Sequence, residues 1–224
     1  MIQSIKIEAL ENNVPIIQDA SLEKINSIIK ENNVKKILEI GTAVGYSSIC
    51  FCQNESVEEI HTIERNIDMY NKATENIDLM KLNDKIKVLF GDALEVDNKI
   101  LPNDFDLMFV DAAKAQSKKF IEKYLPNMKV NGIIVVDNIL FHGVDKNDPT
   151  ISKNLKHLVE KIEMFIEWIT NDDRFETTIF NGGDGLTISL IKDENSRTKW
   201  YFITWWNSSW RLYVRRRKTF NWMF

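Results

Sequence analysis

Short apolar runs rich in β-branched residues alternate with amphipathic stretches from residue 35 to residue 191. Each run is bounded by polar, charged or glycine residues, a pattern that predicts strands. The predicted strands are residues 35–40, 59–64, 85–90, 105–111, 132–137, 176–180 and 186–191. Because strands that alternate with helices form βαβ units, we expect a mostly parallel sheet.

Helical spacing of apolar residues marks most of the segments between these strands. The predicted helices are residues 66–82, 116–128 and 151–170, with a further helix over residues 21–30 ahead of the first strand. Only residues 181–185 separate the last two strands, and a loop that short joins antiparallel neighbours. The expected fold is therefore an α/β domain with a seven-stranded, mostly parallel sheet, one antiparallel strand and helices on both faces.

The length of 224 residues suits one sizeable α/β domain. No apolar run approaches the length of a membrane span, and the N-terminus lacks the apolar region of a signal peptide, so we expect a cytoplasmic protein with no membrane contact. Cys50 and Cys52 are the only cysteines. Two residues apart on a helix, they would point to different sides, which favours reduced buried thiols over a disulfide or a metal pair.

The net charge of −4 is unevenly distributed along the chain. Residues 193–224 hold seven Lys or Arg, two Asp or Glu, and five of the six tryptophans, without a strand or helix period. Such a composition suits contact with RNA or a membrane. Because the α/β pattern is complete at Ile191, we instead interpret residues 193–224 as an atypical tail, for example an out-of-frame extension, beyond a domain of residues 1–192.

Oxygen-bearing side chains end two of the predicted strands. Asp111 follows one apolar run, and Asp137 and Asn138 follow the next. If these strands are neighbours, the three side chains converge at one edge of the sheet and could hold a Mg²⁺-like ion with open coordination positions. Lys114, one helical step past Asp111, is a candidate catalytic base, with a surface lysine or an ion pair with Asp111 as the alternatives.

Three earlier strand ends carry the features of a nucleotide-binding edge. Residues 41–45 form a glycine-containing turn after the first strand, although Ala43 replaces the middle glycine of the dinucleotide fingerprint. Glu64 ends the second strand at the spacing of a ribose-hydroxyl acceptor. Asp92, after the third strand, could accept a hydrogen bond from an adenine amino group or cap the next turn.

Together these segments resemble class I S-adenosylmethionine-dependent O-methyltransferases. The resemblance is carried by residues 39–47, Glu64, 91–93, 110–114 and 136–138, and it covers about residues 10–192. It is a resemblance to the metal-dependent branch that includes catechol and caffeoyl-CoA O-methyltransferases. It implies a Rossmann-like fold, S-adenosylmethionine and a divalent cation such as Mg²⁺ as cofactors, and a homodimer.

The resemblance also implies roles for single residues. The implied metal ligands are Asp111, Asp137 and Asn138, and the implied catalytic residues are Asp111 and Lys114. The implied cofactor-binding residues are Ile17, Gly41, Ala43, Ser47, Glu64, Asp92, Ala93 and Asp111. Residues 139–150 follow the ligands directly and are expected to form part of the acceptor pocket, where Phe141 could stack on a flat acceptor ring or pack against the domain.

Residues 14–17, 137–143 and 183–189 look most like the bacterial tRNA 5-hydroxyuridine methyltransferases. This closer resemblance implies methylation of 5-hydroxyuridine at the tRNA wobble position to 5-methoxyuridine. A metal ion with adjacent open positions favours two vicinal oxygens, which a catechol-type small aromatic molecule also supplies, so the motif does not choose between these acceptors. A non-catalytic, methyltransferase-like interaction module is a further alternative, and a dehydrogenase would require the full glycine fingerprint.

Overall fold

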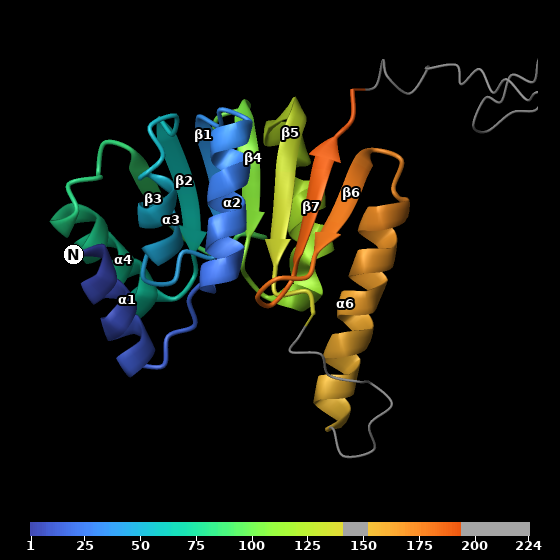
Figure 1. Cartoon of the computed structure of the whole chain (residues 1–224), viewed down its shortest axis with the longest axis horizontal. Helices are drawn as coiled ribbons and strands as arrows, with labels where there is room; N and C mark the ends of the chain where they lie inside the picture. The colour runs from blue at the N-terminus through green and yellow to red at the C-terminus, as the bar shows by residue number, and fades with distance from the viewer. Residues whose placement is uncertain (141–151, 194–224) are drawn as a thin grey trace, which may run out of the picture.

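A seven-stranded sheet forms the centre of the protein in a computed structural model that describes residues 1–140 and 152–193 (Figure 1). The strands are β1 (Lys36–Ile40), β2 (Glu59–Glu64), β3 (Ile86–Phe90), β4 (Phe105–Val110), β5 (Met128–Asp137), β6 (Phe175–Phe180) and β7 (Leu186–Ile191). The α-helices are α1 (Ile2–Glu11), α2 (Asp19–Glu31), α3 (Tyr46–Phe51), α4 (Ile67–Leu79), α5 (Ser117–Tyr124) and α6 (Lys153–Asn171). Short 3₁₀ turns are η1 (Asn98–Ile100), η2 (Lys114–Gln116) and η3 (Leu125–Asn127).

The strand order is β3-β2-β1-β4-β5-β7-β6, which confirms the predicted fold class. The pairs among β3, β2, β1, β4 and β5 are parallel, whereas β7 runs antiparallel to both of its neighbours, β5 and β6. The register pairs Val110 of β4 with Val136 of β5. Asp111 and Asp137, one residue further along, therefore leave the sheet side by side, as the sequence predicted.

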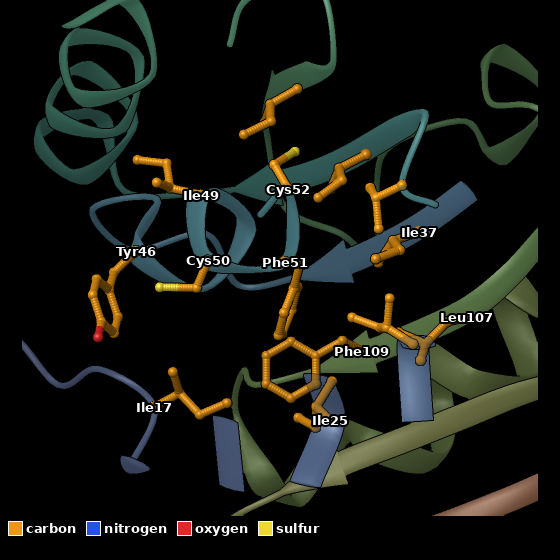
Figure 2. Packing of buried hydrophobic residues seen from close by; sticks show 14 of the residues in the cluster. Ile17, Ile25, Ile37, Tyr46, Ile49, Cys50, Phe51, Cys52, Leu107 and Phe109 are labelled. Carbon is orange, nitrogen blue, oxygen red and sulfur yellow. The ribbon is translucent and has the colours of Figure 1, made fainter. Parts of the chain in front are cut away.

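Helices cover both faces of the sheet. Alternate residues along each central strand enter two separate cores, as Ile37 and Leu38 of β1 do. The first core packs under α1, α2, α3 and α4, and the second packs under α5 and α6. In Figure 2 the rings of Phe51 from α3 and Phe109 from β4 meet edge to face, with centroids 5.4 Å apart. This packing holds the turn after β1 firmly against β4.

The two cysteines lie in the first core as predicted. Cys50 and Cys52 are both buried free thiols, and Figure 2 shows their side chains pointing apart. Burial raises the pKa of each thiol to about 11, so both are protonated near neutral pH. They act as small apolar residues of the core.

The predicted helix over residues 116–128 was wrong at its C-terminal end. Helix α5 ends at Tyr124, and β5 begins at Met128, ahead of the predicted start at residue 132. Pro126 lies in the 3₁₀ turn between them, and its ring and missing N–H prevent the helix from continuing. The side-chain amide of Asn127 then donates to the Pro102 carbonyl and anchors the exit of the turn.

Two other helices also differ from the sequence prediction. Helix α1 was not predicted, and it buries Ile5 and Ala9 against the first core. Helix α4 is shorter than residues 66–82: Asn66 caps its N-terminus through hydrogen bonds from the N–H groups of Asp68 and Met69, and the helix ends at Leu79, shortly before Lys81 adopts a φ of +57°. Within the described ranges, no helix combines the length and apolarity that crossing a membrane requires. The predicted contribution of Phe141, the rest of residues 141–150 and the tail after Asp193 lies outside the described residues.

Candidate active site

A cavity of about 400 Å³ lies where the ends of β1, β2, β3 and β4 meet the segment ahead of α2. Parallel strands present their carboxyl ends at one edge, which is where open α/β sheets bind their ligands. The predicted residues that line this cavity are Ile17, Gly41, Ala43, Ser47, Glu64, Asp92, Ala93, Asp111, Lys114 and Asn138. Every predicted site residue except Asp137 thus lines the cavity, and Asp137, which is 4% exposed, accepts a hydrogen bond from the adjacent N–H of Asn138.

The turn after β1 depends on Gly41 for its close packing against β4. Gly41 has φ of +99°, and a Cβ atom there would lie 2.3 Å from the carbonyl oxygen of Asp111. The N–H of Asp111 in turn donates to the Ile40 carbonyl at 2.9 Å. Glycine therefore lets the turn contact the neighbouring strand end, because no Cβ atom separates them. This contact brings the turn and Asp111 into one cavity wall.

Glu64 fastens the same turn from the end of β2. Its Oε2 accepts hydrogen bonds from the N–H groups of Thr42 and Ala43, at 3.2 and 2.9 Å. Its Oε1 accepts from the N–H of Asn66 at 2.8 Å. A carboxylate has about four lone-pair positions, so Glu64 keeps acceptor capacity toward the cavity that it lines.

Asp92 and Ala93 form the cavity wall after β3. Asp92 Oδ1 accepts from the N–H of Leu94 at 2.8 Å, so the predicted turn cap is present. The hydroxyl of buried Tyr124 donates to the Ala93 carbonyl at 2.6 Å and holds this turn against α5. Asp92 nevertheless lines the cavity, and its other carboxylate oxygen lies 3.8 Å from a guanidinium nitrogen of Arg65, which also lines the cavity.

Glu39 is a buried carboxylate that lies under the turn. It was not among the predicted site residues. It is fully buried in β1 and accepts hydrogen bonds from the hydroxyls of Ser47, Ser48 and Thr62. Burial raises its pKa to about 7, although the three hydroxyl donors favour the charged form. A charged residue inside an otherwise apolar strand was the available signal, and the contact with Ser47 ties Glu39 to the cavity wall.

Replacing Glu39 should change how stability depends on pH. Because its pKa rises from 4.5 to about 7 on folding, the folded state binds the extra proton, and stability falls as pH rises through this interval. Over this interval the free energy of unfolding falls by about 3 kcal/mol. Because glutamine does not titrate, the Glu39→Gln variant should lack this pH-dependent loss of stability. Its free energy of unfolding should therefore rise relative to that of wild type between pH 5 and pH 8. Urea unfolding at both pH values measures the difference, and an unchanged pH dependence would contradict it.

Asp111 and Lys114 form an ion pair at the end of β4. Lys114 Nζ lies 2.8 Å from Asp111 Oδ1, and their side chains are 16% and 29% exposed. The predicted ion-pair alternative for Lys114 is therefore present as a contact. Both residues line the cavity, so Lys114 is also within reach of a molecule bound there.

Asp137 and Asn138 complete the oxygen cluster from the end of β5. Burial and, second to it, the nearby charge of Asp111 together raise the pKa of Asp137 to about 6. Asn138 has φ of +64°, and its buried Oδ1 has no hydrogen-bond partner among the residues that the structure describes. An unpaired buried acceptor beside two carboxylates is unfavourable alone and fits a hard cation. Among the described residues no three His, Cys, Asp or Glu form a metal-binding group, and this cluster consists of two carboxylates and the amide of Asn138.

Comparison with known proteins identifies the family. The model of the O-methyltransferase family matches residues 7–192 of the chain. A caffeoyl-CoA O-methyltransferase from Populus kitakamiensis is 29% identical over 171 residues, which cover 73% of each chain. The chain therefore belongs to the O-methyltransferase family.

Solved structures of similar proteins agree with this assignment. A Staphylococcus aureus protein provisionally named a caffeoyl-CoA O-methyltransferase is 38% identical, with a TM-score of 0.78 over 85% of this chain and 91% of that one. A Bacillus cereus O-methyltransferase in complex with SAH is 25% identical, with a TM-score of 0.72 over 85% and 90% of the two chains. The predicted class of enzyme, an S-adenosylmethionine-dependent O-methyltransferase, is confirmed.

Proposed function

We propose that this enzyme is metal-dependent and methylates one of two vicinal oxygens on its acceptor. The observation that carries the proposal is the cluster of Asp111, Asp137 and Asn138. In it a buried amide oxygen lacks a partner within the described ranges, and two carboxylates lie close together. These residues would hold a divalent cation such as Mg²⁺. The cofactor would occupy the adjoining cavity, with its ribose at Glu64, its adenine at Asp92 and Ala93, and its methionine part at Ser47.

The residues of the chain divide the catalytic work between binding and proton transfer. When bound, S-adenosylmethionine supplies a sulfonium methyl group, and the divalent cation lowers the pKa of the acceptor hydroxyl. Asp111 lies between the two binding regions and orients Lys114 through the 2.8 Å ion pair. Lys114, whose side chain lines the cavity, is the candidate general base for the acceptor hydroxyl. Ile17, which is buried in the cavity wall, helps to exclude water from the cofactor.

The proposed acceptor is 5-hydroxyuridine at the tRNA wobble position, whose 5-hydroxyl and 4-carbonyl are vicinal oxygens. Support comes from the three segments that resemble tRNA 5-hydroxyuridine methyltransferases, because described parts of all three meet beside the cluster. Residues 15–17 and Asn138 line the cavity. The N–H groups of Ile139 and Leu140 donate to carbonyls of Gly185 and Asp184, which joins the second and third segments.

A caffeoyl-type small molecule is the second candidate acceptor. The similarity to named relatives favours it: several proteins that are 26–29% identical to this chain and similar to it in length are named caffeoyl-CoA O-methyltransferases. Such an acceptor also presents two vicinal oxygens on a flat ring. The cluster of oxygen ligands would bind it in the same way, so an assay of both acceptors is needed.

The experiment compares methyl transfer to matched acceptors. Purified enzyme, S-adenosylmethionine and Mg²⁺ are incubated with an anticodon stem-loop that carries 5-hydroxyuridine, the same RNA with uridine, caffeoyl-CoA, or catechol. We expect methylation of the 5-hydroxyuridine RNA alone, and its loss in EDTA. Transfer only to caffeoyl-CoA or catechol would overturn the acceptor, and activity that survives EDTA would overturn the metal. Bound cofactor without transfer to any acceptor would support an interaction module.

The proposal extends to the assembly and boundaries of the protein. We expect residues 1–192 to form the catalytic domain, which agrees with a family match that ends at residue 192. Homodimer formation, which the family resemblance implies, is tested by light scattering of the purified chain. A monomer at assay concentration that retains full activity would contradict it.

A further inference from the structure

Asp137 has one carboxylate oxygen that is held in place by two donors. The N–H of Asn138 donates to Asp137 Oδ1 at 2.7 Å, and the Ser21 hydroxyl donates to the same oxygen at 3.2 Å. Within the described part of the chain, no hydrogen bond reaches Oδ2. A carboxylate anchored through one oxygen keeps a fixed orientation, and its second oxygen remains available to a cation.

Ser21 reaches this carboxylate from a distant part of the sequence. It lies in the first turn of α2, 116 residues from Asp137, and it is 0% exposed. A buried serine hydroxyl needs a partner, and here the partner is the carboxylate that the proposed metal site requires. The contact therefore joins α2 to the end of β5.

Gly183 in the turn between β6 and β7 makes room for the Ser21 hydroxyl. A Cβ atom at Gly183 would lie 2.9 Å from Ser21 Oγ, and the residue has φ of +61°. The same turn accepts hydrogen bonds from Ile139 and Leu140, directly after the proposed ligands. The start of α2 and this turn thus both lie beside Asp137 and the residues that follow it.

We infer that Ser21 is a positioning residue for the metal ion: its hydroxyl holds Asp137 so that Oδ2 is presented as a ligand. The inference rests on the proposed metal-dependent function. It adds a residue from α2 to a site whose other members all follow β4 and β5. Outer hydrogen-bond partners of metal ligands commonly change metal affinity by about 10- to 100-fold.

The test measures binding of Mn²⁺ alone to the full chain by electron paramagnetic resonance, without cofactor or acceptor. We expect Ser21→Ala to weaken Mn²⁺ binding by about tenfold, while S-adenosylmethionine affinity stays within about twofold of wild type. The matched control is Ser189→Ala, which removes an equally buried hydroxyl that bonds to Thr177 instead of a proposed ligand. Thermal unfolding shows that both variants are folded.

Activity measurements give a second readout that a general loss of stability would not produce. For Ser21→Ala, the Mg²⁺ concentration that gives half-maximal rate should rise about tenfold, and saturating Mg²⁺ should restore kcat. Equal Mn²⁺ affinity in wild type and Ser21→Ala would overturn the inference and leave the proposed function intact, as would an equal loss in Ser189→Ala. Failure of wild-type protein to bind Mn²⁺ would overturn the metal-dependent function itself.

Discussion

Asp137→Ala is expected to lower the rate of methyl transfer by about a thousandfold, because loss of a metal ligand removes several kcal/mol of transition-state stabilisation. Cofactor affinity should change by less than about twofold, since Asp137 does not line the cavity. Single-turnover rates measure the first effect, and calorimetry with S-adenosylmethionine measures the second. Full activity in this variant would show that the cluster at the ends of β4 and β5 has no catalytic role.

Asp106→Ala is the matched control for this experiment. Asp106 belongs to β4 but lies at the amino end of the strand, where it accepts hydrogen bonds from the N–H groups of Lys35 and Lys36 and from Lys129 Nζ. These contacts lower the pKa of Asp106 despite the cost of burial, so its carboxylate stabilises the fold. The control should unfold more easily than wild type while kcat at a permissive temperature is retained.

Gly41→Ala is expected to lower both the free energy of unfolding and the affinity for S-adenosylmethionine. The new Cβ atom would meet the Asp111 carbonyl oxygen at 2.3 Å, in a residue with φ of +99°. Strain and displacement of the neighbouring strand end should lower the free energy of unfolding by about 3 kcal/mol. Because the turn and Asp111 form one cavity wall, S-adenosylmethionine affinity should fall as well. Urea unfolding and calorimetry measure the two losses.

Gly45→Ala separates backbone strain from the steric clash. Gly45 also has a positive φ, +80°, but a Cβ atom there would lie 3.5 Å from Ala73, an ordinary contact distance. We therefore expect a loss of about 1 kcal/mol from strain alone. If the two variants lost equal stability, the close packing of Gly41 against Asp111 would not be the reason for glycine in this turn.

The strand pattern was predictable because each central strand is a run of apolar residues that ends at a polar residue. Burial on both faces produces such runs, and the antiparallel end of the sheet followed from the short loop over residues 181–185. The helix boundaries were less predictable. The apolar spacing continued past Tyr124, and only the conformation around Pro126 and the anchoring of Asn127 show that the chain turns into β5 there.

The candidate site was predictable where strand ends carry it. The order of residues alone places Asp111, Asp137 and Asn138 at the ends of two strands, and a glycine turn and two acids at the ends of the others. Chain order and residue type suffice for that, since parallel strands end at one edge. Three further contacts come from the packing of the folded chain: Ser21 of α2 bonds to Asp137, Glu39 lies buried under Ser47, and Gly41 packs on Asp111. Each of these contacts joins segments brought together by packing, and local sequence patterns contain no record of such a partner.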